Sequence, residues 1–193
     1  SLTRQGLNFE FLTAEATEED WLARVRPETR AVYTESIPNP KNDVVDLELL
    51  GRVAAKAGVP LIVDNTVATP YLCRPIEWGA DIVIHSTSKW LSGHGSVIGG
   101  VIVDAGKFDW AANSERFPHF TKGSFEGAPS FIERYGADTF ISYVKSVTVL
   151  DYGPTVPPTS TFLLLHGIET LSLRMERHVE NAQRVAEWLE ARP

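Results

Sequence analysis

The sequence predicts an α/β domain in which helices flank a mostly parallel β-sheet. Four short apolar runs, rich in β-branched residues, predict strands at 31–33, 61–63, 82–84 and 101–103. Each run is continuous rather than alternating, which is typical of strands covered on both faces, as in a parallel sheet. An amphipathic stretch separates the first two runs. A strand, a helix and a strand in this order form a βαβ unit, whose crossover is right-handed.

The helix of this unit is predicted over residues 44–57. Its apolar residues fall at positions 47, 50, 53, 54 and 57, which share one face of a helix. Gly58 follows directly and is a typical helix stop.

The second half of the chain has helical spacing. Shorter helices are predicted at 129–135 and 139–150, separated by Gly136, and a loop begins at 151–154. One long helix is predicted over 160–191, and its apolar residues are expected to pack in a core: Leu164, Ile168, Leu171, Met175, Val179, Ala182, Ala186 and Leu189. A helix of about 30 residues spans roughly 45 Å. We therefore expect residues 1–159 to form the main domain and residues 160–193 to lead to a further domain.

Composition excludes several classes of function. The 18 Lys and Arg residues against 25 Asp and Glu give a formal charge of −7, which argues against a nucleic-acid partner held through its phosphates. The longest apolar run, 162–165, is far below the roughly 20 residues of a membrane span, so no membrane partner is expected. A single cysteine excludes an internal disulfide and favours a reducing, cytoplasmic setting. The five histidines have no metal-ligand spacing, so no metal is expected.

Three polar clusters directly follow predicted strands, at 35–40, 64–66 and 85–90. Taken singly, Asp64 could cap a helix, Asn39 could form a turn, and a lysine is usually a solvated charge. The carboxyl ends of parallel strands, however, meet at one edge of the sheet, where open α/β sheets bind ligands. The shared placement therefore predicts a ligand site.

The residue types at this edge suit one cofactor. Lys89, if buried, would have its pKa lowered from about 10.4, so that its amine could form a Schiff base. Ser86 and Ser88 could donate to one phosphate, although the segment is not a nucleotide-binding GxxxxGK[ST] loop. Asp64 lies 25 residues before Lys89, about one strand–crossover–strand repeat, and could keep a pyridine nitrogen protonated. Together these residues describe a site for pyridoxal 5'-phosphate.

The segments 64–72 (DNTVATPYL) and 79–95 (GADIVIHSTSKWLSGHG) resemble the cofactor-binding signature of the pyridoxal-phosphate enzymes of cysteine and methionine metabolism. The resemblance implies the aspartate aminotransferase type of fold (fold type I). It also implies that Lys89 carries the cofactor and is the catalytic residue, that Asp64 pairs with the ring nitrogen, and that Ser86 and Ser88 bind the phosphate. The segment 35–40 (ESIPNP) is similar to the family's E-[ST]-x-x-N-P element, which implies that Asn39 lies by the phenolic oxygen. Thr66 is implied as a support for the ring.

Within the family, segments 136–141 and 164–182 look most like O-acetylhomoserine sulfhydrylases. The implied reaction is a γ-replacement that converts O-acetylhomoserine and sulfide, or methanethiol, into homocysteine, or methionine, and acetate. A methionine or cystathionine γ-lyase and a cystathionine γ-synthase remain alternatives. A further alternative is an inactive fragment that acts as an α/β interaction module. The resemblance also implies a homo-oligomer, a tetramer in most of the family.

Overall fold

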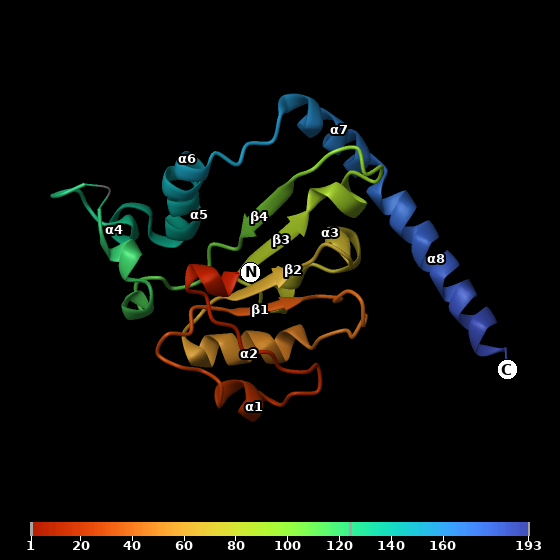
Figure 1. The fold of residues 1–193 in the computed structure, drawn as a ribbon, viewed down its shortest axis with the longest axis horizontal. Helices are drawn as coiled ribbons and strands as arrows, with labels where there is room; N and C mark the ends of the chain where they lie inside the picture. The colour runs from red at the N-terminus through yellow and green to blue at the C-terminus, as the bar shows by residue number, and fades with distance from the viewer. Residues whose placement is uncertain (1, 124, 193) are drawn as a thin grey trace.

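The computed structural model describes residues 2–123 and 125–192 of the chain. At its centre lies a four-stranded sheet of strand order β1-β2-β3-β4 (Figure 1). The strands are β1 (Val32–Glu35), β2 (Leu61–Asp64), β3 (Ile82–Ser86) and β4 (Gly100–Asp104). Each of the four predicted strands is confirmed, and β1, β2 and β3 are parallel. β4 is antiparallel to β3, because residues 87–99 return the chain without a crossover helix.

Helix α2 (Leu47–Ala57) covers one face of the sheet. It begins after the predicted start because the Asp46 side chain caps it by accepting the Leu49 N–H at 2.9 Å. It ends at Gly58, which has the left-handed φ of 65° that glycine tolerates best. All five predicted apolar positions are buried, and they pack against Val32, Leu61, Val63 and Val83 of the strands. The predicted amphipathic face is confirmed.

The opposite face of the sheet is covered by an aromatic cluster. Ile82 packs there with Trp110, Phe117 and Phe120, next to the partly buried Phe140. Along β2 and β3, successive side chains alternate between the two clusters, as the pleat of a strand requires. β2 and β3 are therefore covered on both faces, as predicted, whereas Tyr33 on the second face of β1 is 50% exposed.

The remaining short helices lie around this centre. Their bounds are η1 (Leu2–Gln5), α1 (Glu18–Leu22), α3 (Thr69–Leu72), η2 (Pro75–Trp78), η3 (Thr87–Leu91), η4 (Ser114–Arg116), η5 (Pro118–Thr121), α4 (Phe131–Tyr135), η6 (Gly136–Asp138), α5 (Thr139–Tyr143), η7 (Val144–Thr148) and α6 (Val149–Tyr152). The predicted helices at 129–135 and 139–150 correspond to α4 and to the run from α5 to α6. A capping box between Ser130 and Glu133 starts α4.

The predicted long helix at 160–191 is two helices, α7 (Pro158–Glu169) and α8 (Leu171–Glu190). Thr170 separates them, because its φ of −102° and ψ of 4° lie outside the helical range. α8 extends away from the sheet toward the C-terminus (Figure 1). Among the described residues, no helix is both long enough and apolar enough to cross a membrane.

The expected burial of the apolar stripe is confirmed only near the junction of α7 and α8. Leu171 and Met175 are buried, but Ile168, Val179 and Leu189 are 42%, 47% and 58% exposed. The prediction is wrong for these three residues and for Ala182 and Ala186, which are also exposed, because most of α8 extends away from the sheet.

Strand β4 also departs from the expectation that each strand is covered on both faces. Its residues Val101, Ile102 and Val103 are 40%, 43% and 39% exposed. β4 has only one neighbouring strand among the described residues, which makes it an edge strand.

Candidate functional site

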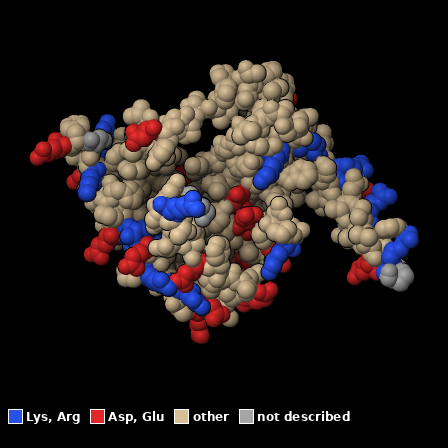
Figure 2. Space-filling view, viewed as in Figure 1, with Lys and Arg blue, Asp and Glu red and all other residues tan. Residues whose placement is uncertain are grey.

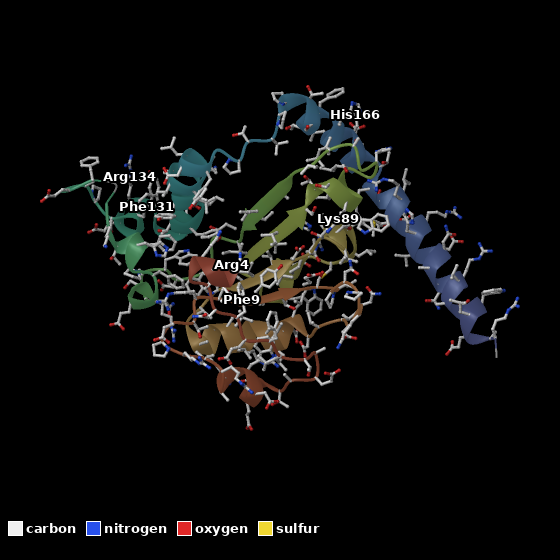
Figure 3. All side chains as sticks on the ribbon, viewed as in Figure 1. Arg4, Phe9, Lys89, Phe131, Arg134 and His166 are labelled. Carbon is white, nitrogen blue, oxygen red and sulfur yellow. The ribbon has the colours of Figure 1, made fainter. Side chains whose placement is uncertain are left out.

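The three predicted polar clusters lie at one edge of the sheet. Glu35 is in register with Asp64 across β1 and β2, and Asp64 is in register with Ile84 across β2 and β3. β3 continues to Ser86, after which the chain turns and carries Lys89 (Figure 3). The prediction that the clusters meet at the carboxyl ends of neighbouring strands is therefore confirmed. Neighbouring strands lie about 4.8 Å apart, the scale of a small ring.

Thr66 connects the ends of β2 and β3. Its hydroxyl donates to Oδ1 of Asp64, and its N–H donates to the same oxygen at 2.9 Å. The hydroxyl oxygen also accepts the Ser86 N–H at 2.8 Å. Thr66 is buried, so this set of hydrogen bonds holds the carboxylate in one orientation. The family resemblance implies that Thr66 supports the ring, and in this structure Thr66 contacts the Asp64 carboxylate.

The hydrogen bonds of the described residues engage only one oxygen of the Asp64 carboxylate. Oδ1 accepts both Thr66 donors, and Asp64 as a whole is half-buried. Oδ2 is therefore available to a hydrogen-bond donor outside this set. A protonated ring nitrogen is a donor of this kind.

Lys89 lies in the π-helical turn η3, where its φ of −101° and ψ of −116° leave the helical range. The Thr87 carbonyl accepts the Ser92 N–H at 3.1 Å, which closes the π-helical turn, and the Lys89 carbonyl accepts the Gly93 N–H at 2.9 Å. π-helical turns are rare and are often found at functional sites. The turn gives the Lys89 side chain a direction that a regular helix does not provide.

The side chain of Lys89 is exposed, and no ion pair among the described residues includes it. The burial on which the sequence argument for a reactive amine depends is absent for Lys89 itself, although α7 and α8 pack against Leu91 of the same turn. The condition for desolvating the amine is therefore not met by these residues.

Ser86 and Ser88 lie on either side of the start of η3. Oγ of Ser88 accepts the Gly99 N–H at 3.1 Å, so this hydroxyl faces the start of β4. Ser86, at the end of β3, is in register with Gly100. A side chain at position 99 would clash, since a Cβ there would lie 2.8 Å from Oγ1 of Thr87. Both residues lie within three positions of Lys89 along the chain, and their binding of a phosphate stays a prediction.

Asn39 is the predicted site residue that the structure does not connect to the others. It lies exposed in the turn after β1. In the described part of the chain, no hydrogen bond links it to Asp64, Thr66 or Lys89. Its place in the site therefore remains a prediction from the sequence.

Two buried polar residues beside Asp64 were not predicted as site residues. Asn65 is fully buried, and its amide donates to the Cys73 carbonyl at 2.8 Å. His85 is buried on β3, and burial lowers its pKa against the opposing effects of the Asn65 backbone and the Asp64 charge. The imidazole is therefore neutral at neutral pH. In the sequence, only the position of His85 directly before Ser86 indicates that it lies near the site.

The residues present fit pyridoxal phosphate. A fixed carboxylate with one available oxygen suits the ring nitrogen, an accessible amine suits the aldehyde, and neighbouring hydroxyls suit the phosphate. In residues 2–123 and 125–192, no group of three or more His, Cys, Asp or Glu side chains could hold a metal ion.

Fold and site together define an α/β protein with a carboxylate, an amine and hydroxyls at the carboxyl edge of its sheet. The family model for "Cys/Met metabolism PLP-dependent enzyme" matches residues 1–193. The chain therefore belongs to the Cys/Met metabolism family of PLP-dependent enzymes. This confirms the resemblance inferred from the sequence motifs.

Individual relatives agree with this family. The chain is 48% identical to the homocysteine synthase of Schizosaccharomyces pombe, over 100% of this chain and 45% of that protein. It is 47% identical to the homocysteine/cysteine synthase of Saccharomyces cerevisiae, over 100% of this chain and 44% of that protein. The chain thus spans about half the length of these curated relatives.

A crystal structure from Campylobacter jejuni subsp. jejuni confirms the predicted fold type. It is named for an O-acetylhomoserine (thiol)-lyase and contains a pyridoxyl-lysine monophosphate. The TM-score is 0.84 at 32% identity, and the match covers 91% of this chain and 43% of the other.

Proposed function

We propose that this chain is part of a PLP-dependent transferase that replaces the γ-substituent of O-acetylhomoserine. Sulfide or methanethiol enters, acetate leaves, and homocysteine or methionine is formed. The observation that carries the proposal is the Asp64 carboxylate, fixed by Thr66 at the end of β2, beside the strand that leads into the Lys89 turn. The names of the relatives support the choice of substrate.

The proposed roles follow from the chemistry of each side chain. Pyridoxal phosphate, when bound, supplies an aldehyde and a ring that accepts electrons. Lys89 would hold the cofactor through its aldehyde and would move protons at the α and β carbons of the substrate. Asp64 accepts a hydrogen bond from the ring nitrogen and keeps it protonated.

Three further residues complete the proposed site. Ser86 and Ser88 bind the phosphate, and the Ser88 hydroxyl can do so in exchange for its bond with Gly99. Asn39 lies beside the phenolic oxygen.

The exposure of Lys89 indicates that other parts of the protein complete the site. We propose that residues 1–159 form the central part of the PLP-binding large domain, and that residues 160–193 lead to a C-terminal domain. The share of the relatives' length that the chain covers supports this division.

The proposed assembly is a homotetramer in the cytoplasm. Support comes from exposed apolar residues on α7, where Phe162 is 60% and Leu165 57% exposed. Figure 2 shows few charged side chains over this region. Chromatography with light scattering measures the assembly, and a monomer under assay conditions would contradict this part of the proposal.

The function is tested with the holoprotein and two lysine variants. Lys89→Ala is expected to lose both the visible absorbance of the bound cofactor and the formation of homocysteine from O-acetylhomoserine and sulfide. Lys145→Ala, which changes an exposed lysine on η7, serves as the matched control and is expected to keep both.

Each contrary result has a defined meaning. Turnover and the visible band retained in Lys89→Ala would refute the role of Lys89. Formation of 2-oxobutanoate and ammonia in place of homocysteine would identify a γ-lyase, and a preference for cysteine as the sulfur donor would identify a cystathionine γ-synthase. A stable protein that binds no cofactor would instead favour an interaction module.

A further inference from the structure

Arg174, in the first turns of α8, joins three parts of the chain through its guanidinium group. Nη1 donates to the Trp90 carbonyl at 2.8 Å, and Nη2 donates to the Gly167 carbonyl at 2.7 Å. Nε donates to Oγ1 of Thr170 at 3.1 Å. The acceptors belong to the lysine turn, to the end of α7 and to the residue between α7 and α8. One planar group thus ties the turn that carries Lys89 to the junction of the two helices.

Two glycines provide the space for this contact. A Cβ on Gly93 would lie 2.7 Å from Cζ of Arg174. A Cβ on Gly167 would lie 2.6 Å from the Leu91 carbonyl oxygen and would also clash with the Ser92 carbonyl. Real Cβ contacts are essentially never this close. The backbones of α7 and the lysine turn therefore approach each other closely because Gly167 lacks a side chain, and Gly93 leaves room for the Arg174 guanidinium.

Apolar contacts hold the same parts together. Leu91, from the lysine turn, forms a buried cluster with Leu171 and Met175 of α8. The Trp90 ring meets the His178 ring edge-on, with 4.7 Å between the ring centroids. The apolar contacts bring the turn to α8, and the guanidinium fixes the orientation of one peptide group within it.

We propose that Arg174 is a positioning residue for Lys89. The Trp90 peptide lies next to Lys89 in the chain, so a fixed Trp90 carbonyl restricts the backbone from which the Lys89 side chain extends. A guanidinium presents its donors in a rigid fork, whereas a lysine amine presents a single point charge. Arg174→Lys therefore keeps the charge but loses the simultaneous contacts. This inference rests on the proposed function, since it concerns the placement of the same amine.

The test uses the full protein that contains this chain, with Arg174→Lys, Arg174→Ala and the control Arg177→Lys. Arg177 lies on the same helix, and within the described ranges its one ion pair is with Glu180, at 3.2 Å on an exposed surface. Hydrogen exchange of the backbone amides of residues 87–93 is measured first, without cofactor. Both Arg174 variants are expected to exchange at least about fivefold faster there, while exchange in β2 and β3 is unchanged.

Kinetics and chemical rescue provide the second readout. In the holoprotein, a misplaced amine is expected to lower kcat by about 10- to 100-fold and leave KM within about twofold. Ethylguanidinium, added to Arg174→Ala, is expected to restore at least about a fifth of the lost kcat. Sodium chloride at the same concentration is expected to restore none. A residue that only stabilises the fold would not show this rescue.

Some results would overturn the proposal. Unchanged exchange of residues 87–93 in Arg174→Lys, or a kcat equal to that of Arg177→Lys, would refute the positioning role. If Arg174→Ala does not fold, the exchange and kcat of Arg174→Lys alone test the positioning role. If the wild-type protein forms no homocysteine, the proposed function is refuted. The positioning role of Arg174 is still tested in that case, because the exchange measurement needs neither cofactor nor substrate.

Discussion

Replacing Thr66 with valine removes one hydroxyl from the site and keeps the size of the side chain. The hydroxyl donates to Asp64 and accepts the Ser86 N–H at 2.8 Å. Loss of a hydrogen bond to a charged group costs about 1.5–3 kcal/mol, and an N–H left without an acceptor costs about 1–3 kcal/mol when buried. Water can replace part of both lost hydrogen bonds, since Asp64 and Ser86 are only half-buried. We therefore expect Thr66→Val to lower the free energy of unfolding by about 2–3 kcal/mol.

Urea unfolding, followed by circular dichroism, measures this loss. Thr66→Ser keeps the hydroxyl and is expected to cost about 1 kcal/mol, the value of one buried methyl group. The control Thr161→Val removes an exposed hydroxyl from α7 and is expected to change stability by less than about 0.5 kcal/mol. If Thr66→Val is as stable as this control, the bridge between β2 and β3 does not hold Asp64 in the way described.

Two further predictions concern packing and pH. Gly167→Ala is expected to lower the free energy of unfolding by about 1–3 kcal/mol, because the added methyl group meets the Leu91 and Ser92 carbonyls. A gain in thermal stability would contradict the close packing of α7 on the lysine turn. Burial raises the pKa of Asp81, so the folded state holds this proton more tightly than the unfolded state, and Asp81 costs stability once the pH exceeds its ordinary pKa near 4. Asp81→Asn, which can still accept the Leu61 N–H, is therefore expected to gain stability relative to wild type as the pH is raised from 3 to 6. A stability difference between the two proteins that does not change with pH would refute the raised pKa of Asp81.

Much of the sheet and its helix could be predicted from local pattern. The five apolar positions of α2 and its end at Gly58 follow rules of spacing and capping that involve only neighbouring residues, whereas the start at Leu47 differs from the predicted residue 44. The shared edge of the polar clusters followed from topology, because parallel strands place their carboxyl ends together.

Long-range contacts could not be predicted in this way. The apolar stripe of residues 164–189 runs without interruption through Thr170, and nothing in its spacing indicates a break there. The break coincides with hydrogen bonds from Arg174 to Thr170 and Gly167, which depend on how the helices meet the lysine turn. Periodicity also does not show whether a partner surface is present, so the exposure of Val179 could not be foreseen.

Within the site, residue types were predicted better than contacts. The bridging position of Thr66 depends on the register of β2 and β3, and the π-helical turn at Lys89 depends on a closing hydrogen bond from the Ser92 N–H to the Thr87 carbonyl. Spacing rules applied to the sequence detect neither the Thr66 bridge nor the π-helical turn. The motif match identified the same residues through family resemblance.

The attachment of the cofactor tests the central proposal most directly. The holoprotein is reduced with borohydride, digested and analysed by mass spectrometry for the phosphopyridoxyl group. This group is expected on Lys89 alone, in amounts near one per chain, with none above background on Lys41, Lys56, Lys107, Lys122 or Lys145. A label spread over the other lysines, or a protein that binds the cofactor and leaves Lys89 unlabelled, would contradict it.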